Sequence, residues 1–146
     1  MFGEHGDSAF IPWSVANVSN VPIDECQKVL GHSPLENPAM DYDEIEQYVK
    51  KSGGRVIARK GATFYAVSIS VCHIIKCLLN GMDTTMTVST MMHGEYGIDD
   101  VCLSTLNLLG NKQVNGKVLV PLTDDEVARL RASADTLKGI IKGLTI

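Results

Sequence analysis

The sequence lacks three patterns that would place it in a well-defined class of protein. Its four cysteines include no Cys-x-x-Cys pair, it contains no Gly-x-Gly-x-x-Gly fingerprint, and no apolar run approaches the ~18 residues that cross a bilayer. The first absence argues against a structural zinc site. The second means that dinucleotide binding cannot be assigned to these residues directly. The third predicts that no segment spans a membrane.

Clustered positive charge is also missing. Lysine and arginine total 13 against 17 aspartate and glutamate residues, which gives a net charge of -4 and a pI near 5.5. Binding to nucleic-acid phosphates needs clustered cations, and the one basic stretch, from Lys50 to Lys60, has the pattern of a solvated helix face. Nucleic acid is therefore not an expected partner. The charged start is unlike a secretory signal, so we expect a cytoplasmic protein.

What is present fits one globular domain, with 45% hydrophobic and 21% charged residues in 146. No repeat, low-complexity tract or linker divides the sequence, so residues 1–146 are expected to form a single domain. The apolar residues 9–18 indicate a strand, or a strand followed by a turn. Residues 31–37 are rich in Gly, Ser, Pro and Asn and indicate a loop.

Two helices are expected in the middle of the chain. Asp41 followed by Glu44 resembles a capping pair, so the first helix should begin near Tyr42. Gly53-Gly54 should kink or break it, because each glycine costs about 1 kcal/mol relative to alanine inside a helix. The second helix, residues 63–80, carries apolar residues on more than one side. It is expected to be central to the core.

The second half combines strands with a final helix. Strands are expected at residues 84–92, 101–109 and 117–122. The glycine- and asparagine-bearing residues 110–116 predict an antiparallel hairpin with a loop or bulge between the last two strands. Residues 123–126 form a capping box, and apolar residues then recur at helical spacing as far as Ile141. The predicted fold class is therefore α+β.

The cysteines near the second helix do not suggest a metal site. Cys72 and Cys77 flank an apolar stretch, where free cysteine behaves as a small buried hydrophobe. Together with His73 they stand at positions i, i+1 and i+5, which share a helix face poorly. His73 itself is expected to be a satisfied buried or interface residue. No metal is predicted.

The strongest candidate for chemistry is His5, which lies between Gly3-Glu4 and Gly6-Asp7. Glycines remove Cβ bulk, so a substrate can approach the imidazole closely. Glu4 and Asp7 would favour the protonated ring if they lay beside it. The preceding Met1-Phe2 has the character of a strand end. The pattern is typical of a proton-transferring histidine, although a lone loop histidine most often has no chemical role.

With these residues in view, the sequence resembles the C-terminal, substrate-side half of enzymes of the lactate and malate dehydrogenase family. Four stretches carry the likeness in the family's order, and the tail at 122–126 and 133–137 resembles the family's final helix. The stretches are Gly-Glu-His-Gly-Asp-Ser at 3–8 with Trp13-Ser14, Lys-Gly-Ala-Thr at 60–63, Gly94 with Tyr96-Gly97, and Leu103-Ser104 through Leu109-Gly110. The glutamate before the histidine favours the lactate branch over the malate branch.

The resemblance implies roles for three residues. His5 corresponds to the histidine that gives a proton to the substrate carbonyl oxygen and takes it back in the reverse direction. Thr63 corresponds to a residue whose hydroxyl lies beside the substrate, with capping of the following helix as the alternative. Val67 corresponds to a position that packs against the nicotinamide ring, with plain core packing as the alternative.

The resemblance also implies what these residues need from elsewhere. The family interconverts pyruvate and L-lactate with NAD, which is bound mainly by an N-terminal Rossmann domain absent from this sequence. That domain supplies the arginines and the aspartate that orients the histidine, so the isolated chain is expected to be inactive. A homo-oligomer is implied. Two alternatives stay open: an L-2-hydroxyisocaproate or malate dehydrogenase, and a non-catalytic truncated fragment or interaction domain.

Overall fold

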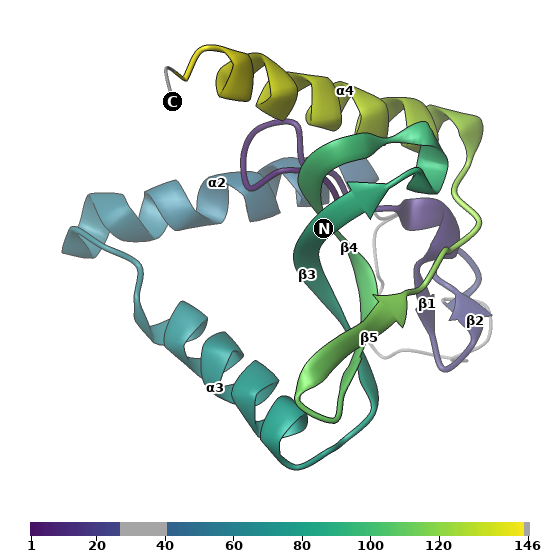
Figure 1. Cartoon of the computed structure of the whole chain (residues 1–146). Helices are drawn as coiled ribbons and strands as arrows, with labels where there is room; N and C mark the ends of the chain where they lie inside the picture. Colours follow the sequence, from purple (N-terminus) through teal and green to yellow (C-terminus); the bar gives the residue numbers. More distant parts are fainter. Residues whose placement is uncertain (27–40, 145–146) are drawn as a thin grey trace.

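The computed structural model describes residues 1–26 and 41–144 and has the predicted α+β class, with helices beside antiparallel strands (Figure 1). The loop predicted at residues 31–37 lies outside the described residues. In chain order the elements are η1 Trp13–Val15, β1 Asn17–Val18, β2 Val21–Pro22, α2 Tyr42–Lys60, α3 Tyr65–Leu79, β3 Thr84–His93, η2 Glu95–Gly97, β4 Asp99–Gly110, β5 Gln113–Lys117 and α4 Asp124–Lys142.

The main sheet has the order β3-β4-β5, with both pairs antiparallel. Alternate residues of β4 from Val101 to Leu109 are buried, as a strand with one covered face requires. Asn111 and Lys112 both have positive φ, which gives the tight turn whose twist matches the flanking strands. The predicted hairpin is confirmed, but its last strand begins at Gln113, whereas the sequence predicts a strand over 117–122. The bulge lies within β5, opposite Leu108 and Leu109.

Helix α4 crosses one end of the sheet and closes the core (Figure 1). Its predicted capping box is confirmed: the Thr123 side chain accepts from the Glu126 backbone, and the Glu126 side chain accepts from the Thr123 backbone. Leu130 is fully buried on its inner face. The core combines the first ten residues, the sheet and α4. Its buried members are Phe2, Phe10, Met92, Ile98, Val101, Leu103, Leu130 and Ala134.

Of the two alternatives for residues 9–18, a continuous strand is wrong, and a short extended stretch followed by a turn is what the structure shows. Phe10 makes a single antiparallel bridge with Phe2, and the chain then turns through the 3-10 helix η1. Pro12 explains the change, because it has no N–H to continue a ladder. Its carbonyl instead accepts from Val15 N at 3.3 Å. What remains of the strand is β1, which pairs with β2 in a hairpin.

Helix α2 begins as predicted but does not break at the glycine pair. Asp41 caps it by accepting from Glu44 N at 2.9 Å. The helix continues through Gly53 and Gly54 to Lys60, and Gly61 ends it with φ of 80°. Two glycines cost about 2 kcal/mol together, which is less than what a long helix gains from its backbone bonds and from caps at both ends. The predicted kink or break is therefore wrong.

The sequence predicts that helix α3 is central to the core, and the structure shows that it is not. Cys77 is its one buried residue, whereas Tyr65, Ile69 and Leu79 are 68%, 71% and 64% exposed. Cys72 is exposed, contrary to expectation, whereas Cys77 is buried as expected. His73 is exposed within the described residues, so it is not buried, and the interface position given as its alternative stays a prediction. Figure 1 shows α3 standing away from α4, and we call residues 61–79 the α3 arm. Most of its apolar residues stay exposed within residues 1–26 and 41–144, and the buried Cys77 and half-buried Leu78 lie at its C-terminal end.

Candidate functional site

The loop that carries His5 is fixed to the middle of the sheet at its first residue. Gly3 and Ser104 exchange two backbone hydrogen bonds of 3.0 and 2.8 Å. Phe2 and Phe10 exchange two more, of 2.8 and 3.0 Å, across the base of the loop. The strand-end character predicted for Met1-Phe2 is met only in part, because Phe2 forms an isolated antiparallel bridge and belongs to no strand. We call residues 3–9 the His5 loop; its ends are held together, as in a hairpin.

A close approach to α4 fixes the other side of the loop. Gly3 has φ of 97°, and a Cβ added there would lie 2.6 Å from Ser133 Oγ. Glu4 N donates to the same Ser133 Oγ at 2.8 Å. A side chain at residue 3 would be both strained and blocked, so only glycine suits this position. The loop therefore rests between β4 and α4.

His5 itself is exposed at the tip of this loop. The carboxylate of Glu4 turns away into the loop, where Oε1 accepts from Ser8 N at 3.2 Å and from the Ser8 hydroxyl. Among the described residues, no ion pair joins His5 to a carboxylate. Glu4 has a structural role here. The imidazole is left open to a molecule arriving from solvent.

Thr63 and Val67 lie on the α3 arm and are both exposed, Val67 at 55%. The capping role considered for Thr63 is wrong, because the N-cap residue of α3 is Phe64. The core role considered for Val67 is wrong as well. In the part of the chain that the structure describes, no hydrogen bond joins either residue to His5. The two candidate regions therefore stand on separate elements, the His5 loop and the α3 arm.

Two buried carboxylates hold the first fifteen residues against the helices. Glu46 of α2 accepts from Ile11 N at 3.0 Å and pairs with Lys50 and Arg129. Glu126 of α4 accepts from Ser14 N at 3.1 Å. Burial acts to raise the pKa of each carboxyl, but the hydrogen bonds outweigh it and hold both pKa values below the ordinary range. Both groups are therefore charged at neutral pH.

Ser133 is the residue of this region that sequence reasoning missed. It is fully buried on the inner face of α4, close to Leu130 and Ala134. The one signal in the sequence is its place among apolar residues at helical spacing, where a serine needs a hydrogen-bond partner. Nothing local indicates that this partner lies at the start of the chain.

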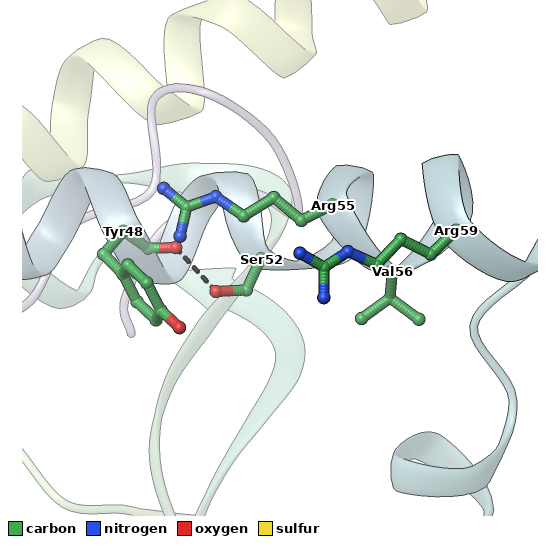
Figure 2. A pocket seen from close by; sticks show the side chains of 5 residues that line it. All are labelled: Tyr48, Ser52, Arg55, Val56 and Arg59. Carbon is green, nitrogen blue, oxygen red and sulfur yellow. Dashed lines mark hydrogen bonds between the residues drawn. The ribbon is translucent and has the colours of Figure 1, made fainter.

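The basic stretch forms a shallow groove along α2, shown in Figure 2. Its volume is about 280 Å³, and every lining residue belongs to α2. The Arg55 guanidinium lies 4.3 Å from the centre of the Tyr48 ring, and Ser52 donates to the Tyr48 carbonyl at 2.6 Å. These contacts are made within one helix face. None of the candidate site residues lines the groove.

Neither a metal centre nor a membrane helix is found in the described part of the chain. Within residues 1–26 and 41–144, no three His, Cys, Asp or Glu side chains gather where they could hold a metal ion. The helices over the same residues are too short or too polar to cross a bilayer.

Known proteins with similar sequences place the chain in a family. The model of the lactate/malate dehydrogenase alpha/beta C-terminal domain matches residues 1–145. An L-lactate dehydrogenase of Acetivibrio thermocellus is 37% identical over 147 residues, covering 100% of this chain and 45% of that protein. One from Thermoanaerobacterium saccharolyticum is 36% identical, covering 100% and 46%. The chain thus spans less than half the length of these relatives.

Solved structures agree. A minor L-lactate dehydrogenase of Enterococcus mundtii in its ligands-bound form superposes with a TM-score of 0.86 at 28% identity, covering 99% of this chain and 45% of that one. A malate dehydrogenase of Archaeoglobus fulgidus in complex with NADH gives 0.80 at 26% identity, covering 98% and 42%. The fold, the family model and the relatives lead to one conclusion: the chain belongs to the lactate/malate dehydrogenase family, and its residues are those of the α/β C-terminal domain.

Proposed function

We propose that residues 1–146 form the substrate domain of an NAD-dependent L-lactate dehydrogenase, with His5 as the group that moves the proton. The observation that carries this proposal is the exposed His5 on a loop fixed to both β4 and α4. A proton donor must reach the substrate yet keep a defined position. The L-lactate dehydrogenases among the relatives support the substrate assignment.

In this proposal the imidazolium of His5 donates a proton from a ring nitrogen to the carbonyl oxygen of pyruvate. In the reverse direction the neutral ring takes a proton from the hydroxyl of L-lactate. NAD, when bound, supplies or accepts the hydride. The Thr63 hydroxyl contacts the substrate, and the exposed Val67 side chain offers an apolar surface of the kind that packs against a flat ring.

The remaining parts of the reaction centre are expected from a nucleotide-binding half outside these residues. The chain has no glycine fingerprint for a dinucleotide, and it spans less than half of its relatives. The uncovered apolar residues of the α3 arm support packing against that half and against a second copy. We place the assembled protein in the cytoplasm as a homo-oligomer.

A second function has one observation in its favour. The structural similarity to a malate dehydrogenase favours a dicarboxylic substrate. Turnover of pyruvate and of oxaloacetate can be followed by NADH absorbance, first with the 146-residue chain alone and then with the chain joined to a nucleotide-binding half. The substrate that the joined protein turns over faster decides between the two functions.

The deciding experiment replaces His5 with Gln in the complete enzyme. Loss of general acid catalysis should lower kcat for pyruvate reduction by about 10² to 10⁴-fold, whereas NADH binding, measured by fluorescence titration, should stay nearly unchanged. The isolated chain should show no turnover. If His5→Gln weakened NADH binding but left turnover intact, His5 would not be the proton donor.

A further inference from the structure

Three residues, Glu4, Ser8 and Ser133, form a closed ring of hydrogen bonds next to His5. Glu4 N lies 2.8 Å from Ser133 Oγ, and Ser133 Oγ lies 2.9 Å from Ser8 Oγ. The Ser8 hydroxyl in turn contacts Glu4 Oε1, which also accepts from Ser8 N. The ring thus starts at the Glu4 backbone and returns to the Glu4 side chain. It joins the two ends of the loop to α4.

The chemistry of the groups fixes the direction of this ring. A backbone N–H can only donate, and an ionised carboxylate can only accept. Glu4 N must therefore donate to Ser133, and the single proton of Ser8 is used on the Glu4 carboxylate. The proton between the two hydroxyls then comes from Ser133. Every member is satisfied, and such a cycle holds its atoms more firmly than separate bonds would.

Burial makes the ring depend on residue 133 in particular. Ser133 is 0% exposed, and its Oγ occupies the place where a side chain of Gly3 would have to go. An alanine at 133 would leave the half-buried Glu4 N–H without its partner. The Gly3–Glu4 peptide would then be held on one side only, by the bond of 2.8 Å from Ser104 N to the Gly3 carbonyl. His5 is the next residue along the chain.

We propose that Ser133 is a positioning residue for the reaction: through the ring it sets the backbone at Glu4 and so aims the His5 imidazole. This inference rests on the proposed role of His5 as the proton donor. Ser133 contacts no substrate. Misplacing a catalytic group by about 1 Å can lower a rate by about 10²-fold, so a distant helix residue can control turnover without altering the binding of NADH.

The test is a double-mutant cycle between Ser133 and His5 in the complete enzyme. Ser133→Ala should lower kcat for pyruvate reduction by about 10 to 100-fold when His5 is present. In the His5→Gln background the same change should lower kcat less than about 2-fold, because the group that Ser133 positions is gone. NADH affinity should not change in any variant.

A matched control lies on the same helix. Thr136 is exposed, and its hydroxyl bonds its own helix at Ala132 O, 3.0 Å away. Thr136→Ala removes a hydroxyl from α4 outside the ring and should leave kcat unchanged. If Ser133→Ala does not fold, Ser8→Ala breaks the same ring at a half-exposed position, and it should show the same dependence on His5.

The possible failures are distinguishable. Equal losses of kcat from Ser133→Ala with and without His5 would show a general structural effect and overturn the positioning role. An unchanged kcat in Ser133→Ala, alongside a large loss in His5→Gln, would overturn the positioning role and leave the proposed function standing. An unchanged kcat in His5→Gln would overturn both.

Discussion

The body of the molecule, formed by residues 1–15, the β3-β4-β5 sheet and α4, differs from the α3 arm in how it treats apolar side chains. Phe10, Leu103 and Leu130 are fully buried in the body. Ile69 and Leu79 of the arm are 71% and 64% exposed. Both regions carry apolar residues at regular spacing. The body covers its own, whereas the described residues leave most of those of the arm uncovered.

This difference shows that an apolar pattern predicts a covered face but does not predict which residues cover it. Periodic apolar residues indicate that a face is built to be covered, because exposed patches of this kind promote association. They do not say whether the cover comes from the same residues. In this family member the arm carries the proposed substrate and nicotinamide contacts, Thr63 and Val67. We therefore expect the cover of the arm, and part of its order, to come from outside residues 1–146.

The largest expected effect contrasts one buried and one exposed leucine. Leu130→Ala should lower the free energy of unfolding by about 3 kcal/mol, through lost burial and a cavity under α4. Leu79→Ala on the arm should change it by less than about 0.5 kcal/mol. Urea denaturation followed by circular dichroism measures both. Similar losses for the two variants would mean that the arm is buried in solution and would break the comparison.

Next in size is the ion pair that ties α2 to the body. Glu46→Gln should lower the free energy of unfolding by about 2 kcal/mol, because Arg129 and Lys50 lose their charged partner. The Arg129 side chain is 37% exposed, so this loss is smaller than for a fully buried pair. Glu44→Gln, an exposed change in the first turn of the same helix, should cost no more than about 0.5 kcal/mol, through the lost interaction of its charge with the helix dipole.

The pH dependence of this loss has a definite sign. The pKa of Glu46 is lowered in the folded protein, so its contribution is present above its ordinary value of 4.5 and is lost as the pH falls below it. Unfolding curves of the wild type and Glu46→Gln should therefore converge in acid. A gap that persisted at low pH would show that the charge of Glu46 is not the cause.

A smaller effect is expected at the turn between β3 and β4. Hydrogen bonding from the His93 backbone, followed by the ion pair with Lys117 at 3.0 Å, lowers the pKa of Glu95 to about 2. Glu95→Gln should lower the free energy of unfolding by about 1 kcal/mol at neutral pH, since the pair is partly solvated. The greater stability of the wild type over this variant should be lost as the pH falls from 4.5 to about 2. Equal acid sensitivity in both proteins would contradict this.

The smallest effect has the opposite sign. Gly54→Ala should raise the free energy of unfolding by about 0.5 to 1 kcal/mol, because a Cβ there meets nothing within 4 Å. Gly61→Ala is the matched control: its Cβ is equally free, but its φ of 80° disfavours alanine, so that variant should be destabilised. Thermal unfolding of the two variants separates space from backbone conformation. A destabilised Gly54→Ala would mean that α2 needs a flexible point.

The elements predicted correctly are those with local signals. Asp41 and Thr123 cap α2 and α4 through bonds that reach three residues along the chain, so a short window contains the whole cause. The alternation of β4 is local in the same way. The exposure of α3 could not be predicted in this way, because it depends on what packs beside the helix, which no window contains. The early end of the strand at Pro12 has a local cause instead, since proline has no N–H to continue a ladder.

The candidate site divides along the same line. His5 could be proposed from its glycine and carboxylate neighbours, and its exposure on an anchored loop is compatible with that proposal. The contribution of Ser133 could not, because its partner Glu4 is 129 positions away in the sequence. Thr63 and Val67 were proposed from the family resemblance. They lie exposed on the α3 arm, so their contacts with substrate and nicotinamide stay predictions.

The distance in sequence between Glu4 and Ser133 also determines when their hydrogen bond can form during synthesis. A ribosome makes residue 4 of these 146 long before residue 133, so a growing chain carries the His5 loop without its anchor for most of that time. Closing so long a segment is an entropically costly, late event in folding. A translation product that stops short of α4 would contain the histidine and still lack the geometry. Among these 146 residues, the earliest to be made are among the last to reach their final shape.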